Sequence, residues 1–344
     1  MPRYARCFSF SSALRVLENR HCLLLLQLDR TLRGLDSAII VEQAQALRPG
    51  HTCTFELPLD YVAIKKAKGP KNYSGMNIHF PLDFDDGIKW MVRARFAKVY
   101  CPPPDLQRMV TESEVTTMRF LKENNILVPD AWLPPVVNSK TDSNLSPDSK
   151  LSYELLQDSP LISCLLVGNG TDYFFEEFID GQSWMGETTP LTEDTIADDI
   201  ARTFITDMAR HHQLLSSIPL KVQGIGSLWP NEAQSDPPQL GPLIQGSFLM
   251  TPDPPYFLGP FKTNKERYLT KIDLAMDYIR QGCSLRADPV GYLLAHLEMR
   301  DLVEGNEEMG REETEFFIKH ADDKNDQYML TEDGHIVGVL DWEW

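Results

Sequence analysis

The sequence predicts an α+β fold of two lobes, in which a small antiparallel sheet with one helix precedes a mainly helical half. Two observations predict this order. Strand-like segments gather in the first half of the chain, and after residue 181 the pattern changes to apolar residues at helical spacing. The expected division is an N-terminal extension over residues 1–50, an N-terminal lobe over 51–179 and a C-terminal lobe over 180–344.

Charge and cysteine usage narrow the class of protein. The 344 residues carry a formal net charge of −17, which argues against a nucleic-acid partner and against an anionic membrane surface. The six cysteines lie far apart without a C-x-x-C pair, and this favours reduced thiols over a disulfide framework or a zinc site. No apolar run approaches the roughly 18 residues of a transmembrane helix.

These properties predict a cytoplasmic protein. A mitochondrial location is the alternative, because the first 17 residues carry three arginines and no acidic residue, as transit peptides do. Helices are expected from Ser12 and from Ser37 onward, and they carry no recognisable chemistry. The oligomeric state stays open.

The clearest element of the N-terminal lobe is a β-hairpin. Residues 76–84 and 88–96 are strand-like runs joined by Asp85-Asp86-Gly87, and an Asp-Gly turn between such runs is typical of hairpins. In the second run Arg93 and Arg95 share one face, opposite an apolar face.

Further elements follow in order. A helix is expected over 105–124, and strands over 161–167 and 173–179. The C-terminal lobe has four helical patterns: 195–215, a helix capped by Thr263 and Glu266, 291–303, and a short helix that ends near 315. Three short strands are expected near the end of the chain: 316–319, 328–330 and 336–340.

The last 30 residues carry the chemistry. An apolar strand leads to His320-Ala321-Asp322, a second strand follows, and a turn at Asp333-Gly334 returns the chain to Asp341. Phosphoryl transfer needs two such carboxylates: one orients the acceptor hydroxyl and accepts its proton, and the other holds Mg²⁺ against the phosphates. A lone His-x-Asp would indicate only a solvated loop, but the returning hairpin favours the functional interpretation.

These motifs resemble H-G-D-x-x-x-x-N and I-D-W-E of the aminoglycoside phosphotransferase and choline kinase superfamily. HADDKNDQYML followed by GVLDWEW resembles in particular a large group of fungal aminoglycoside-phosphotransferase-like proteins. The resemblance covers about residues 60–344. It implies a protein-kinase-like fold, with ATP and Mg²⁺ as cofactors and a small molecule as acceptor.

The resemblance also implies roles for single residues. Asp322 matches the catalytic aspartate and Asp341 the metal-binding aspartate. Gln327 stands where the family has asparagine as its second metal ligand. Its longer side chain puts the octahedral metal geometry in doubt, and Asp323 or Asp326 could substitute.

A kinase-like site also needs a cation on the third strand, paired with a helix glutamate. Arg93 is the candidate, Arg95 competes with it, and the resemblance implies Glu114 as the partner. The alternative is an ordinary exposed arginine on a strand.

The nucleotide itself is expected to meet two backbone segments. The loop 69–75, which ends at Gly75, lies where a phosphate-covering loop belongs, although it lacks the density of a G-x-G-x-x-G loop. By resemblance, the backbone around Glu177 and Ile179 would bind adenine. The alternative for that segment is a core strand that ends in a turn.

We therefore expect an ATP-dependent phosphotransferase that acts on a hydroxyl of a small molecule. The alternative is a catalytically impaired, nucleotide-binding or interaction protein. The glutamine at 327 and the sparse glycine loop favour this alternative. So does the end of the chain at Trp344, where the family continues with further helices; without them Trp342 is expected to lack packing partners.

Overall fold

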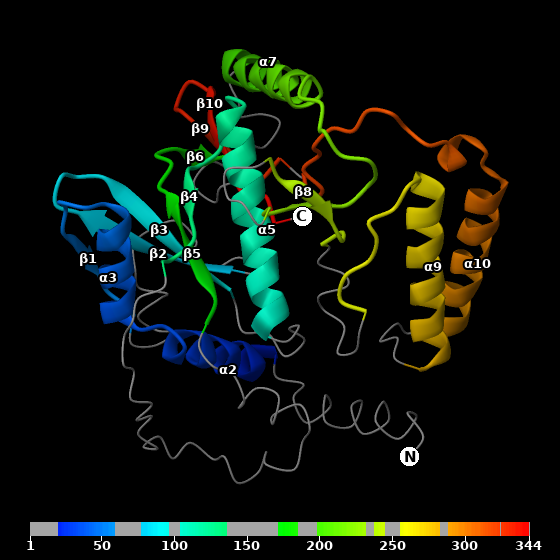
Figure 1. The fold of residues 1–344 in the computed structure, drawn as a ribbon, viewed down its shortest axis with the longest axis horizontal. Helices are drawn as coiled ribbons and strands as arrows, with labels where there is room; N and C mark the ends of the chain where they lie inside the picture. Colours follow the sequence, from blue (N-terminus) through cyan, green and yellow to red (C-terminus); the bar gives the residue numbers. More distant parts are fainter. Residues whose placement is uncertain are drawn as a thin grey trace, which may run out of the picture.

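The computed structural model describes residues 20–58, 77–95, 104–135, 171–184, 198–231, 237–244, 255–282, 288–323 and 325–343. Helices and antiparallel sheets are both present, as the sequence predicts (Figure 1). No helix in these ranges is long and apolar enough to cross a membrane.

A five-stranded antiparallel sheet forms the first part of the structure. Its strands, in spatial order, are β1 (Cys53–Phe55), β2 (Asn77–Phe84), β3 (Lys89–Arg95), β5 (Tyr173–Glu177) and β4 (Ala131–Trp132). The predicted hairpin is confirmed as β2 and β3, and Gly87 adopts a φ of 86° in its turn, which a glycine reaches without steric cost. The strand expected over 161–167 lies outside the described residues.

Helices cover both faces of this sheet. Helices α2 (Arg20–Arg33) and α3 (Ser37–Leu47) pack on the face that carries Trp90, Val92 and Phe175. Helix α5 (Pro104–Glu123), predicted over 105–124, packs on the opposite face with Phe174. Since neighbouring residues of a strand point to opposite faces, Arg93 is turned toward α5.

A second, three-stranded sheet carries the C-terminal motifs. Its order is β10 (Ile336–Val339), β9 (Tyr328–Leu330) and β6 (Gln182–Ser183), which confirms the strands predicted over 328–330 and 336–340. Gly334 has a φ of 87° in the turn between them, and a Cβ there would lie 2.7 Å from the carbonyl oxygen of Ile200. Helix α7 (Asp198–Leu215) confirms the pattern predicted over 195–215. A two-stranded sheet of β7 (Ser227–Trp229) and β8 (Gln239–Gly241) packs beside α5.

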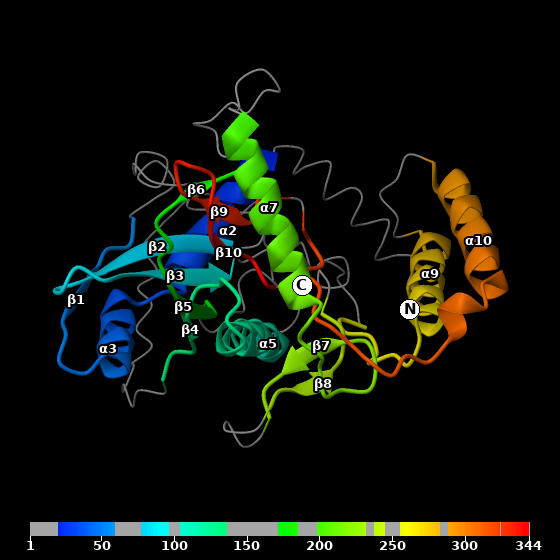
Figure 2. The ribbon, with the colours of Figure 1, turned by 90° about the horizontal axis from the view of Figure 1, so that it is seen from above.

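The remaining helices form a hairpin at one end of the molecule (Figures 1 and 2). Helix α9 (Asn264–Arg280) begins at Thr263, whose hydroxyl accepts a hydrogen bond from the amide of Glu266 as predicted. Helix α10 (Pro289–Gly305) packs along it and has no fully buried residue.

Two elements differ from the sequence prediction. The strand expected over 316–319 is absent from the described residues, where Phe316 makes only an isolated bridge to Leu220. The short helix expected to end near 315 is a 3₁₀ turn, η2 (Glu308–Gly310), which ends five residues earlier. Ile318 packs against an apolar cluster and η2 packs against α9, so these segments are placed by tertiary contacts without a neighbouring strand or a full helical turn pattern.

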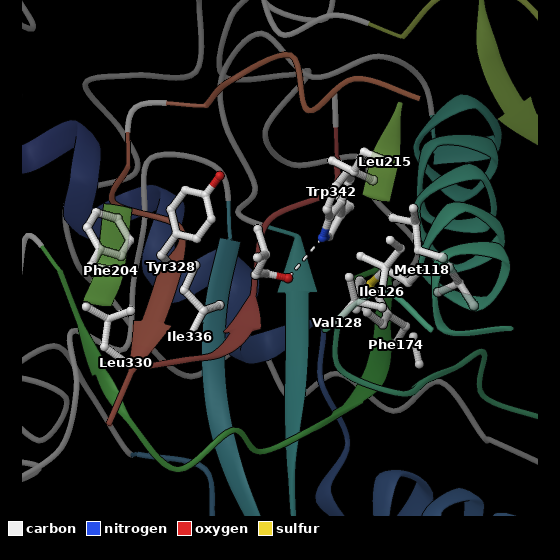
Figure 3. Close-up of a cluster of buried hydrophobic side chains, with 14 residues drawn as sticks. Met118, Ile126, Val128, Phe174, Phe204, Leu215, Tyr328, Leu330, Ile336 and Trp342 are labelled. Carbon is white, nitrogen blue, oxygen red and sulfur yellow. Dashed lines mark hydrogen bonds between the residues drawn. The ribbon is translucent and has the colours of Figure 1, made fainter. Parts of the chain in front are cut away.

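One apolar cluster joins α5 and β5 to the C-terminal hairpin (Figure 3). Trp342 is 3% exposed within it, and its indole N–H donates to the carbonyl of Val339 at 2.9 Å. The expectation that Trp342 lacks packing partners is therefore wrong, because α5, α7 and β9 supply them. Trp344 lies outside the described residues.

Candidate active site

Arg93 lies at the centre of the candidate site and is 3% exposed. Its Nη2 lies 2.9 Å from Glu114 Oε1 and also contacts the carboxylate of Asp341. Its Nη1 lies 3.2 Å from Nε2 of His79, the residue opposite it on strand β2. The structure thus brings together Arg93, Glu114 and Asp341, which the sequence places on a strand, a helix and the C-terminal motif.

Arg95 joins the same cluster. Its Nη2 lies 3.0 Å from Glu114 Oε2, and its Nη1 contacts Glu343. Glu114 therefore bridges both arginines, with one oxygen for each. The two candidate cations do not compete for the helix glutamate; they share it.

Carboxylates outnumber guanidinium groups in this cluster. Five acids act on the two arginines: Glu114, Glu176, Asp341 and Glu343, with Asp172 beside Arg95. Burial raises the pKa of Glu176 to about 7, although Arg93 opposes this, and burial also raises the pKa of Glu114. Buried acids in excess of cations need protons or a further cation for balance.

His79 does not supply that balance. Burial and the neighbouring Arg93 lower the pKa of its imidazole to about 3, so the ring is neutral near pH 7. A neutral ring can accept a hydrogen bond at Nε2 from the Arg93 guanidinium, which agrees with their contact.

Asp341 is the acid of the cluster that solvent reaches best, with a side chain that is 31% exposed. Burial raises the pKa of its carboxyl group, but Arg93 outweighs this effect and holds the pKa below its ordinary value. Its backbone has a φ of 66°, in the left-handed region that residues other than glycine rarely adopt. Asp341 is thus ionised and held in an unusual backbone conformation.

Gln327 connects the two predicted catalytic segments. Its carbonyl accepts a hydrogen bond of 2.9 Å from the amide of Leu340, the residue before Asp341. Its side-chain Nε2 donates to the carbonyl of Asp322. The half-buried Asp322 and Asp341 therefore flank one buried glutamine, although 19 residues separate them in sequence.

His320 also contacts the segment that leads to Asp341. The ring is buried, its Nε2 lies 3.0 Å from the carbonyl of Leu340, and it packs edge-on against Trp342. Asp323, the suggested substitute ligand, lies 3.5 Å from Nε2 of His212 and 3.4 Å from the hydroxyl of Tyr328. Its carboxylate is therefore engaged by α7 and β9.

The segment expected to bind adenine follows strand β5. The amide of Glu177 donates to the carbonyl of Asp130 at 2.9 Å, and the amide of Phe178 donates to that of Lys89 at 3.2 Å. The side chain of Glu177 pairs with Lys122 at 3.0 Å. The amides of Glu177 and Phe178 are thus hydrogen-bonded within the protein, which leaves Ile179 as the remaining residue predicted for this segment. Gly75 lies outside the described residues.

Sequence reasoning missed four members of the cluster: Asn77, His79, Glu176 and Glu343. The hairpin register pairs Asn77 with Arg95 and His79 with Arg93, so the predicted hairpin could have revealed both. Glu343 stands two residues after Asp341, and this spacing was the available signal. Nothing local in the sequence marks Glu176, which reaches the cluster through the pairing of β5 with β3.

A second group of possible metal ligands lies at the β2–β3 turn, where His51, Asp85 and Asp86 have ligand atoms within 4.8 Å of one another. These side chains already bond to each other, to Thr52 and to Arg48. We assign no ion to this group.

Comparison with known proteins finds similarity among solved structures alone. No protein-family model and no curated protein matches the chain. Among solved structures, it is similar to one described as macrolide 2'-phosphotransferase type I, with a TM-score of 0.39 and 14% sequence identity, over 90% of this chain and 72% of that one. Since a similarity this distant carries no functional conclusion, we base the function on the site residues.

Proposed function

We propose that the chain is a phosphotransferase that moves the γ-phosphate of ATP to a hydroxyl group of a small molecule with the help of Mg²⁺. The contact of Asp341 with the Arg93–Glu114 pair supports this proposal. Gln327 supports it as well, because it links the loop of Asp322 to the residue before Asp341. Two carboxylates beside a fixed guanidinium are the groups that phosphoryl transfer requires.

The residues present fit a magnesium ion. Asp341 offers an ionised carboxylate, and Gln327 offers an amide oxygen in the adjoining loop. Oxygen atoms are the ligands that Mg²⁺ prefers, and the excess of acids over arginines favours an added cation. Asp341 and Gln327 would hold the ion, which when bound neutralises charge on the β- and γ-phosphates.

The other residues have roles that follow from their positions. Asp322 would orient the acceptor hydroxyl and accept its proton. Arg93 would contact phosphate oxygens after releasing Asp341, and Glu114 would keep the guanidinium near the sheet. The backbone at Ile179 and the loop at Gly75 remain the proposed contacts for adenine and phosphate.

A second function is a nucleotide-binding protein without turnover. Two contacts favour it: Arg93 binds the carboxylate that the metal needs, and Gln327 directs its amide nitrogen to Asp322. In this case the protein would bind ATP but transfer its phosphate to no hydroxyl compound.

A transfer assay, preceded by binding calorimetry, separates the two functions. ATP binding is measured with and without Mg²⁺, followed by a screen of small hydroxyl compounds for phosphate transfer. Asp322→Asn should abolish transfer and leave binding intact. Asp333→Asn, which changes an exposed acid of the β9–β10 turn, is the matched control and should transfer like the wild type. Tight binding without transfer in every protein would favour the second function.

A further inference from the structure

Glu343 is enclosed more completely than Asp341, although it follows only two residues later. Its side chain is 1% exposed. Oε1 contacts Nη1 of Arg95, and Oε2 accepts a hydrogen bond of 2.8 Å from Nδ2 of Asn77 and lies 3.7 Å from Arg93. Both oxygens are thus bound by β2 and β3, which makes Glu343 unsuited to a metal ion despite its place beside the metal-binding aspartate.

Asp341 needs such a neighbour because of its backbone. Aspartate adopts the left-handed conformation less readily than glycine, so contacts on both sides of Asp341 help to keep it there. On the N-terminal side, Leu340 is held by Gln327 and His320. On the C-terminal side, Trp342 is buried in the shared cluster (Figure 3) and Glu343 is bound to the sheet.

The two arginines of β3 differ in what they hold. Arg93 contacts Asp341, so it must release this carboxylate before either group can serve a nucleotide. The ionic contacts of Arg95 are with Glu114 and Glu343. The Arg95–Glu343 pair can therefore remain in place while Arg93 changes partner.

We propose that Glu343 is a positioning residue that holds Asp341 in its left-handed conformation through Arg95 and Asn77, and that it is not itself a metal ligand. The proposal rests on the proposed function, because it assigns Asp341 to the metal. The two arginines of β3 then have different roles. Arg93 exchanges Asp341 for the nucleotide, whereas Arg95 stays bound to Glu343 and holds the C-terminal segment.

The test is Glu343→Gln, which retains the shape of the side chain and removes its charge. Nucleotide binding is measured by calorimetry over a range of Mg²⁺ concentrations. The half-saturating Mg²⁺ concentration should rise about tenfold, as for other residues that orient a metal ligand, while affinity at saturating Mg²⁺ stays within about threefold. Asp207→Asn is the matched control. Asp207 also contacts the β9–β10 hairpin, through His335 at 2.8 Å, but His335 precedes strand β10 whereas Asp341 follows it. This variant should leave the Mg²⁺ requirement unchanged.

A double-mutant cycle separates positioning from ligation. If Glu343 acts through Arg95, then Arg95→Met raises the Mg²⁺ requirement as well, and the double variant is no worse than the poorer single variant. Additive effects would indicate that Glu343 binds the metal itself, and would overturn the proposal. Should Glu343→Gln fail to fold, Asn77→Ala takes its place with a smaller expected rise, about threefold.

Hydrogen exchange of the ligand-free protein gives a readout that needs no nucleotide. Glu343→Gln should speed amide exchange over residues 336–343 and leave α9 unchanged. If the wild type binds no nucleotide at any Mg²⁺ concentration, the proposed function fails. Hydrogen exchange then still tests whether Glu343 holds residues 336–343 in place. If the wild type binds and Glu343→Gln keeps its Mg²⁺ requirement, the proposed function survives and the positioning role is wrong.

Discussion

Arg93 of strand β3 and Asp341, the second residue after strand β10, contact each other although 248 residues separate them in sequence. The contact joins the group proposed to bind phosphate to the group proposed to bind metal. Under the proposed function, nucleotide and metal binding would therefore have to replace this ion pair with two new interactions, while Arg93 stays paired with Glu114.

Asp341→Asn should weaken Mg²⁺-dependent nucleotide binding at least tenfold, because an amide is a poorer ligand for Mg²⁺ than a carboxylate. Asparagine tolerates the left-handed conformation, so the fold should persist. Calorimetry with ADP and Mg²⁺ measures the first effect and thermal melting the second. Wild-type binding by this variant would remove Asp341 from the metal site.

Arg93→Met should lower the free energy of unfolding by about 3–5 kcal/mol, because it leaves buried acids without their cation. Urea denaturation measures this value. Arg48→Met is the matched control: Arg48 pairs with Asp86 at 2.8 Å near the surface, and its loss should change stability far less. Equal effects of the two substitutions would contradict a central role for Arg93.

Glu176 should make stability depend on pH in the ligand-free protein. Burial raises its pKa from 4.5 to about 7, so the folded state keeps a proton that the unfolded state loses at lower pH. The stability that protonated Glu176 contributes is fully present below pH 4.5. The free energy of unfolding then falls by up to roughly 3 kcal/mol as the pH rises through 7. Glu176→Gln, which mimics the protonated acid, should remove this dependence in urea titrations between pH 4.5 and 8.5. If the free energies of unfolding of the two proteins differ by a constant amount over that range, Glu176 does not cause the pH dependence.

His320→Ala should lower the free energy of unfolding by about 2–3 kcal/mol, since it removes a buried ring that packs against Trp342 and takes away the hydrogen-bond donor of the Leu340 carbonyl. His296→Ala is the control, because this ring on α10 lies 2.8 Å from the carbonyl of Tyr292 but is far less enclosed. Chemical denaturation should show a clearly smaller effect for the control. If both variants lose a similar free energy of unfolding, the burial of His320 does not strengthen its contribution to stability.

Local patterns predicted much of the fold correctly. The β2–β3 hairpin, α5, α7, α9, α10 and the final two strands follow from periodicity, caps and Asp-Gly turns, which act over a few residues. The segment at 316–319 shows the limit: an apolar run becomes a strand only where a neighbouring strand accepts its hydrogen bonds, and Phe316 finds a single partner.

The sequence by itself predicted which residues would serve phosphoryl transfer: Asp322, Gln327 and Asp341 in the C-terminal motifs, with Arg93 and Glu114 before them. Only the tertiary structure decided which of them pair. Glu114 serves two arginines, and Glu343 is bound to Asn77 and Arg95. These contacts depend on strand register and on the packing of α5 against the C-terminal hairpin. Such long-range packing leaves no mark in local spacing, because the partners lie up to 266 residues apart.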